Sequence, residues 1–193
     1  MRYADDANVY VHSQKAGERV MALLRKTYTK LHLKINESKS EVGKVFGREF
    51  LGFSFWVAPK KEVKLKVAAK ALETFKRRIR QLTRRLCGRS IEEIAEQLRP
   101  YLLGWKAYFR LSQTPKIWRK LDEWLRHRLR ALQLKQWKQG PTIYRELRKR
   151  GASDAVARRV AGNAGRWWHN SRLQLNAVLT IAYFDQLGVP RLS

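Results

Sequence analysis

The chain has almost no cysteine and comparatively little negative charge. Cys87 is the single cysteine among 193 residues, so it cannot close a disulfide within the chain, and the 4 histidines are scattered. No Cys or His cluster has the spacing of zinc ligands. No apolar run approaches the roughly 18–20 residues that cross a bilayer, and no secretory signal opens the chain. These absences argue against a disulfide scaffold, a zinc module and a membrane protein, and we expect a cytoplasmic location.

The positive charge is large and unevenly distributed. The chain has 42 Lys and Arg against 16 Asp and Glu, a net charge of +26. Residues 60–150 alone hold 27 basic and 8 acidic side chains, an excess of 19, whereas residues 1–59 and 151–193 have small excesses. Such a segment favours a polyanionic partner, because each phosphate contact releases condensed counterions. A basic surface that is merely solvated is the alternative.

The first third of the chain predicts alternating strands and helix. Residues 2–12 read as a β-hairpin with its second strand around Val9 and Val11, and residues 14–33 as a helix with one apolar face. An extended segment follows at 34–39, and the Phe- and Gly-rich stretch 45–57 predicts a second hairpin. Pro59-Lys60-Lys61 is the candidate boundary, because everything after it reads as helical.

The second part of the chain predicts amphipathic helices, which makes the fold class α+β. A helix is expected over 67–86, and Ser90 with Glu93 forms a capping-box pattern that opens another, which Pro100 should kink or split. Thr114-Pro115 begins a third helix. Shorter helices are expected near 142–150, 154–163 and 173–187.

The 67–86 helix has an apolar back and a basic front. Because A-form RNA and RNA:DNA hybrids expose a wide, shallow minor groove, such a front would meet phosphates and 2′-hydroxyls rather than base edges. A solvated helix face is the alternative. The candidate RNA-binding residues are those of this front together with two from the third helix: Lys70, Lys76, Arg77, Arg80, Arg84, Arg85, Arg126 and Arg130.

The tryptophans divide into two groups. Trp105, Trp118 and Trp124 fall on or beside apolar stripes and are expected mainly in the core. Trp167 and Trp168 are adjacent, so they cannot share one helix face. One of them could stack on an unpaired base, and packing in the core or between domains is the other interpretation.

Tyr3-Ala4-Asp5-Asp6 is a candidate metal-binding motif. Two adjacent carboxylates in a hairpin can bind divalent cations, as two-metal phosphoryl transfer requires. Taken alone the motif is weak, since Asp pairs are common in turns for their own backbone hydrogen bonding.

Several segments follow one another in the order and spacing of a known family. They are Arg2–Ala7 with Val9–Val11, Leu33–Ser40, Glu49–Phe53, Arg99–Trp105 with Tyr108–Phe109, Leu175–Asn176, and Ala182–Gly188. They resemble the palm and the maturase-specific, or thumb, region of bacterial group II intron reverse transcriptases. The resemblance extends over essentially the whole chain. It implies a C-terminal part of the palm over 1–59 and a helical thumb or maturase domain over 60–193.

The resemblance also implies functional residues. Asp5 and Asp6 would be catalytic ligands of Mg²⁺, and Phe50, Leu51, Gly52 and Phe53 would form a primer-grip-like hairpin. Lys39 would stand near the leaving pyrophosphate as a general acid, with a solvated loop lysine as the alternative.

One departure from the family changes the functional expectation. The family's fingers and a further metal-binding Asp precede the Asp pair, which in this sequence follows Met1 almost directly. Two carboxylates are a poor cage for magnesium, so we expect weak or absent metal binding and no polymerisation by this chain alone. The expected function is binding of group II intron RNA to assist its folding and splicing. Alternatives are polymerase activity on an RNA template and DNA primer, restored in trans by a separate fingers and palm segment, or a non-functional remnant of a retroelement.

Overall fold

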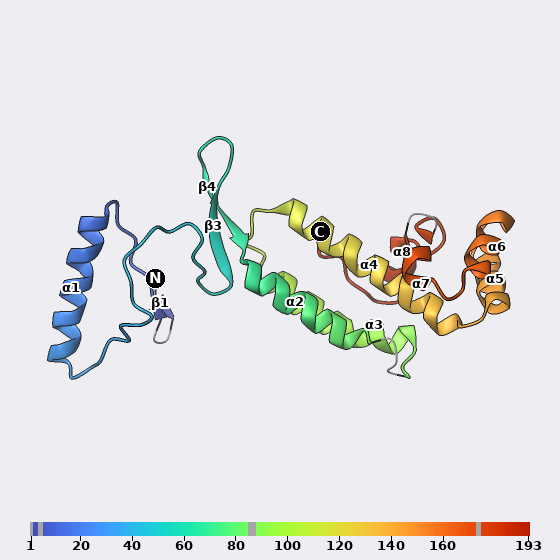
Figure 1. Cartoon of the computed structure of the whole chain (residues 1–193), viewed down its shortest axis with the longest axis horizontal. Coiled ribbons are helices and arrows are strands. Elements are labelled where there is room, and N and C mark those ends of the chain that lie inside the picture. The colour runs from blue at the N-terminus through green and yellow to red at the C-terminus, as the bar shows by residue number, and fades with distance from the viewer. Residues whose placement is uncertain (1, 4–5, 85–87, 173–174) are drawn as a thin grey trace. The chain divides into compact units, whose positions relative to one another are not determined.

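A computed structural model shows two compact units (Figure 1), Met1–Val63 and Lys64–Ser193. The structure describes residues 2–3, 6–84, 88–172 and 175–193. Two short two-stranded sheets occupy the first part of the sequence and helices most of the rest. The α+β fold class is therefore confirmed.

The N-terminal hairpin forms but is shorter than predicted. Strand β1 (Arg2–Tyr3) pairs antiparallel with β2 (Asp6–Ala7), with Arg2 opposite Ala7 and Tyr3 opposite Asp6. The expected continuation around Val9 and Val11 is irregular, and both valines are exposed. An isolated two-stranded ribbon without a packed face is only marginally stable, which explains why it does not extend further.

Helix α1 (Gln14–Lys30) follows, close to the predicted range. The Ser13 Oγ accepts a hydrogen bond from the Ala16 backbone N–H at 3.2 Å and caps its first turn. Gly17 of α1 is buried, and a Cβ there would lie 2.5 Å from Val42 Cγ1. Glycine at this position therefore lets the segment around Val42 pass close to the helix. The predicted apolar face is largely uncovered, because Leu23 and Leu31 are exposed.

The segment 34–39 contains a turn rather than a continuous extended stretch. It returns alongside α1, because both oxygens of the Glu37 carboxylate accept from the Arg25 guanidinium, at 3.0 and 2.5 Å. Both side chains are exposed, so this ion pair contributes little to stability.

The primer-grip-like residues form a tight turn. Phe50 and Phe53 exchange two backbone hydrogen bonds of 2.9 and 3.0 Å across Leu51 and Gly52. Both central residues have positive φ, 51° and 74°, as in a type I′ turn. The second predicted hairpin is thus correct at this turn.

The longer hairpin lies further along the chain than predicted. Strand β3 (Phe53–Val57) pairs with β4 (Val63–Val67), and Pro59-Lys60-Lys61 belongs to the turn that joins them. The expectation that the chain is helical from residue 60 is therefore wrong up to Ala68, and α2 begins at Ala69. The reason is visible in the sequence, because apolar and basic residues alternate over 63–67 with the period of a strand.

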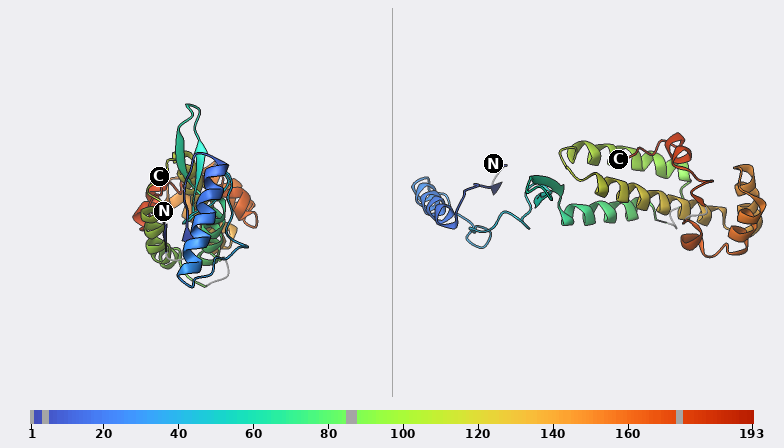
Figure 2. Two further views of the ribbon diagram at one scale, coloured as in Figure 1. Left: turned by 90° about the vertical axis from the view of Figure 1, so that its left-hand side faces the viewer. Right: turned by 90° about the horizontal axis from the view of Figure 1, so that it is seen from above.

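The helical unit contains three long helices and several shorter ones. They are α2 (Ala69–Leu82), α3 (Ile91–Tyr108), α4 (Pro115–Trp137), α5 (Gly140–Lys149), α6 (Asp154–Gly162), α7 (Trp167–Asn170) and α8 (Ile181–Gln186). Helix α3 contacts both α2 and α4, α4 also contacts α5 and α7, and α5 packs closely on α6. Figure 2 shows α2, α3 and α4 running side by side.

Four details of these helices differ from the sequence prediction. Helix α3 continues through Pro100 and is not split. The expected 173–187 helix is reduced to α8 at its C-terminal end, and α7 was not predicted. Helix α2 ends at Leu82, whereas Leu86, the predicted last residue, lies outside the described residues.

Aromatic side chains form the centre of the three-helix core. Phe75 of α2 is fully buried, and its ring centroid lies 4.4 Å from that of Trp105 of α3. Trp105 also contacts Phe109 at 4.7 Å and Trp118 of α4 at 5.1 Å. The core position predicted for Trp105 and Trp118 is confirmed, while Trp124 is half-buried.

The predicted capping box at Ser90 is confirmed and gives a first testable prediction. Ser90 Oγ accepts from the Glu93 backbone N–H at 3.1 Å, and the Ser90 N–H donates to Glu93 Oε2 at 2.6 Å. We expect Ser90→Ala to lower the free energy of unfolding by about 1 kcal/mol. Urea unfolding followed by circular dichroism measures this. Ser90→Thr keeps the hydroxyl and should recover most of the loss, and equal stability of both variants with the parent would contradict the role of the cap.

No helix in the described part of the chain combines the length and the apolar character needed to cross a membrane.

Candidate nucleic-acid interface

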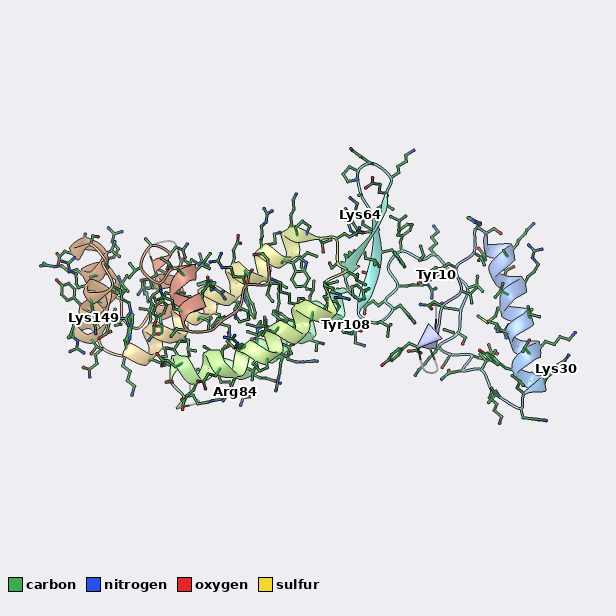
Figure 3. The ribbon with its side chains drawn as sticks, turned by 180° about the vertical axis from the view of Figure 1, so that it is seen from behind. Tyr10, Lys30, Lys64, Arg84, Tyr108 and Lys149 are labelled. Carbon is green, nitrogen blue, oxygen red and sulfur yellow. The ribbon has the colours of Figure 1, made fainter. Side chains whose placement is uncertain are left out.

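One face of α2 carries exposed cations. Lys70, Arg77, Arg80 and Arg84, the last just beyond the helix, are exposed, whereas Phe75 on the opposite face is fully buried. Positions three and seven apart share a helix face, so Lys70, Arg77 and Arg80 form one ridge. Arg84 follows directly after the helix, and the four exposed cations together are called here the α2 basic face. At a rise of 1.5 Å per residue, Lys70 and Arg80 are about 15 Å apart along the helix. Figure 3 labels Arg84 at one end of the α2 basic face.

The α2 basic face keeps a net positive charge. Glu73 is the only acidic residue in the sequence of α2. The Arg77 Nη2 donates to Thr74 Oγ1 at 3.3 Å, and the Arg80 guanidinium lies 5.7 Å from the ring centroid of Trp124 on α4. These neighbours are neutral, so they orient the two arginines without cancelling their charge.

The C-terminal end of α2 is closed by an arginine from α4. Arg128 Nη2 donates to the backbone oxygens of Thr83 at 3.1 Å and Arg80 at 3.3 Å, and its Nε donates to the buried Thr83 hydroxyl. Helix ends leave carbonyl oxygens unpaired, and a cation there is favourable. Arg128 therefore fixes the end of α2, and with it the direction of the basic face, against α4.

Two further predicted cations of the 67–86 helix are not assigned to the α2 basic face. Lys76 is half-buried on the flank of α2. Arg85 lies outside the described residues.

Arg126 and Arg130 are buried, contrary to the exposed position expected of RNA-binding residues. Their exposed fractions are 3% and 6%. Arg126 Nη2 lies 3.3 Å from Asp185 Oδ1 and also from the Val189 carbonyl oxygen, and Arg130 Nε donates to the Leu179 oxygen at 2.8 Å. Both arginines hold the C-terminal segment against α4, so we exclude them from the interface.

Burial also changes the acid–base behaviour of these two arginines. Desolvation lowers the pKa of Arg126, and the nearby carboxylates of Asp122 and Asp185 act in the opposite direction. Burial, followed by the positive charge of Arg126, lowers the pKa of Arg130 to about 10. Arg130 therefore remains charged near neutral pH and keeps its hydrogen bond to the Leu179 oxygen.

Trp167 and Trp168 both contact α4. The Trp168 ring centroid lies 4.0 Å from that of His127, and His127 Nε2 lies 3.0 Å from the Trp168 carbonyl oxygen. The Lys135 ammonium lies 5.6 Å from the centroid of Trp167. Both indoles are half-buried, in agreement with the packing interpretation.

The residues of the predicted catalytic motif are only partly described. Asp6 is exposed on β2, and Asp5 lies outside the described residues. Lys39 is exposed in the turn after α1. Among the described residues, no three His, Cys, Asp or Glu side chains gather closely enough to hold a metal ion. Mg²⁺ takes several oxygen ligands, and the described residues around Asp6 do not by themselves supply them, so no magnesium-dependent step is assigned to the described residues.

The sequence interpretation missed the contacts that fix α4. Asp122 accepts the backbone N–H groups of Leu192 and Ser193 at 3.0 and 2.8 Å, and Arg128 caps α2. The sequence did indicate that α4 is covered on several sides, because Ala131, Leu132 and Leu134 place apolar groups on more than one face of the helix. The arginines between the apolar residues of such a helix are therefore candidates for internal partners.

The fold and the surface define a basic helical domain with a closed core and a cationic outer face. Residues 72–151, from α2 to the end of α5, match the family described as group II intron, maturase-specific domain. No curated protein matches the chain significantly. The sequence from α2 to the end of α5 is therefore similar to a group II intron maturase-specific domain, which confirms the resemblance in this region and supports a maturase-related function in group II intron splicing.

Proposed function

We propose that the helical unit binds structured RNA of group II introns through the α2 basic face and thereby assists intron folding. The proposal depends on one observation about α2: the cations of the α2 basic face are exposed, whereas Phe75 on the opposite side of the helix is buried in the core. The match to a maturase-specific domain, which begins at Leu72 within the same helix, supports intron RNA as the polyanion.

The chemistry of the α2 basic face favours contact with the backbone of paired RNA. The exposed side chains of the face are lysine and arginine, and the helix has no exposed aromatic side chain on which an unpaired base could stack. Guanidinium groups bind phosphate oxygens with two parallel hydrogen bonds. Recognition would then follow the shape of the RNA more than its sequence. A hybrid of RNA template and DNA primer offers a similar backbone and is proposed as a second ligand.

Binding of this kind would stabilise the folded intron by mass action. A protein that prefers the compact, paired form of an RNA shifts its folding equilibrium toward that form. The neutralised phosphates also lower the repulsion between RNA helices that must pack together. No side chain has to act on a reacting bond in this function, so it does not depend on Asp6 or Lys39.

The proposal predicts strongly salt-dependent binding. If the four cations of the α2 basic face each neutralise one phosphate, the affinity for a structured intron RNA should fall by at least about two powers of ten between roughly 50 and 200 mM salt. Fluorescence anisotropy with a labelled intron domain measures this. Absence of binding at the lower salt concentration, or an affinity independent of salt, would refute the proposal.

A further inference from the structure

The outer face of α3 is unusually apolar for a basic domain. Among the described residues from Lys64 to Ser193, four large apolar side chains are exposed, and three of them lie on α3 or directly after it. They are Leu103, Tyr108 and Leu111, with exposed fractions of 46%, 55% and 62%. Leu103 and Tyr108 follow the three- and four-residue spacing of one helix face together with the exposed Pro100, Gly104 and Ala107. Leu111 comes in the turn directly after the helix, and this whole set is called here the α3 apolar stripe.

Gly104 at the centre of this stripe is not required by the packing of the chain. It lies inside the 18-residue helix α3, and a Cβ built on it would meet no atom within 4 Å. Glycine weakens a helix interior relative to alanine, so a glycine with open space around it has no internal explanation. A close approach by an external backbone would explain it.

The stripe borders the helix that carries the basic face. Tyr101 of α3 stacks on Phe75 of α2, with ring centroids 5.8 Å apart and planes inclined by 20°. Burial raises the pKa of Tyr101, and the positive charge of Arg78 on α2 acts in the opposite direction, so Arg78 lies close to this seam. From the seam the α3 surface continues to Gly104 and Tyr108, and Figure 3 labels Tyr108 near the end of α3. Cations of α2 and the apolar stripe thus lie on neighbouring helices.

The charges around the stripe favour a polyanion over a second copy of this chain. From Arg99 to Leu121 the sequence has six basic and no acidic residues. Another copy, with a net charge of +26, would be repelled. A nucleic acid is attracted, and the sugar edge of its minor groove is less polar than its phosphates.

We propose that the α3 apolar stripe lies against the sugar edge of an A-form minor groove while the α2 basic face binds the flanking phosphates, with Gly104 allowing the close approach. The inference rests on the proposed RNA binding, and it adds the residues of α3 that would contact the RNA. The wide, shallow groove of A-form duplexes admits a helix surface of this kind, whereas the narrower minor groove of B-form DNA does not. The stripe therefore distinguishes A-form from B-form duplexes.

The substitution Gly104→Leu separates this role from folding. The space around Gly104 is open and leucine favours helix, so the variant should melt at the same temperature as the parent or a few degrees higher. Its affinity for a labelled hairpin RNA of about 20 base pairs should nevertheless fall about tenfold or more. The slope of affinity against salt should stay unchanged, because no phosphate contact is lost. Affinity for a DNA duplex of the same sequence should also stay unchanged.

A matched control uses another exposed glycine with open surroundings. Gly162 lies at the end of α6, and a Cβ there also meets nothing within 4 Å. Gly162→Leu should bind the hairpin RNA like the parent. If the Gly104→Leu variant binds RNA like the parent, or loses RNA and DNA affinity equally, the inference is wrong even though the parent binds RNA. The inference is also wrong if sedimentation shows that the parent self-associates and that the only effect of Gly104→Leu is to abolish this self-association. If the parent fails to bind the hairpin RNA at low salt, the proposed function itself is wrong.

Discussion

Replacing Phe75 by alanine is expected to lower the free energy of unfolding of the helical unit by about 3–5 kcal/mol. Phe75 is fully buried, and its ring contacts Tyr101 and Trp105 of α3. Removing it would leave a cavity where α2 meets α3, and the indole of Trp105, held also by Trp118, is poorly placed to fill it. The melting temperature measured by circular dichroism should fall by on the order of 10 °C.

The exposed Leu111 provides the control for this prediction. Leu111→Ala removes an apolar side chain of which 62% is already in water, so its effect should stay within about 0.5 kcal/mol. A Phe75→Ala variant as stable as the Leu111→Ala variant would mean that α2 does not pack on α3 through Phe75. The orientation of the α2 basic face would then lose its structural basis.

The helical core was predictable because its pattern is local. Phe75 and Ile79 recur with the period of a helix, Ser90 and Glu93 mark a helix start, and Trp105 falls on an apolar stripe. Such signals need no knowledge of what lies across the core. The structure bears out each of them, with Phe75 and Ile79 fully buried and the capping box complete.

Features that depend on distant partners were not predictable in the same way. The side chains of Arg126 and Arg130 look like those of Arg77 and Arg80 in the sequence, but α8 and the C-terminal segment cover them. Their burial depends on residues about 50 to 60 positions away, which no local period reveals. Likewise, the partner of β3 lies beyond a turn that contains Pro59, which was interpreted as a domain boundary.

Removal of three arginines from the α2 basic face is expected to weaken binding to structured intron RNA on the order of 100-fold at ~0.1 M salt. The variant is Arg77→Ala, Arg80→Ala and Arg84→Ala combined. All three side chains are exposed, so the fold should persist, with a small loss from the contact between Arg80 and Trp124. If each arginine neutralises one phosphate, the log–log slope against salt should become shallower by about 2–3. Anisotropy titrations at several salt concentrations give both quantities.

A second triple variant separates local contact from total charge. Arg145, Lys149 and Arg159 are exposed on α5 and α6, and replacing them by alanine removes the same charge from another part of the helical unit. Because exposed charges are screened beyond about 10 Å at 0.1 M salt, this control should lose less than about tenfold in affinity and keep most of its salt slope. Equal losses in both variants would mean that RNA responds to net charge alone. The α2 basic face would then have no special role, and a maturase function would need a different RNA contact.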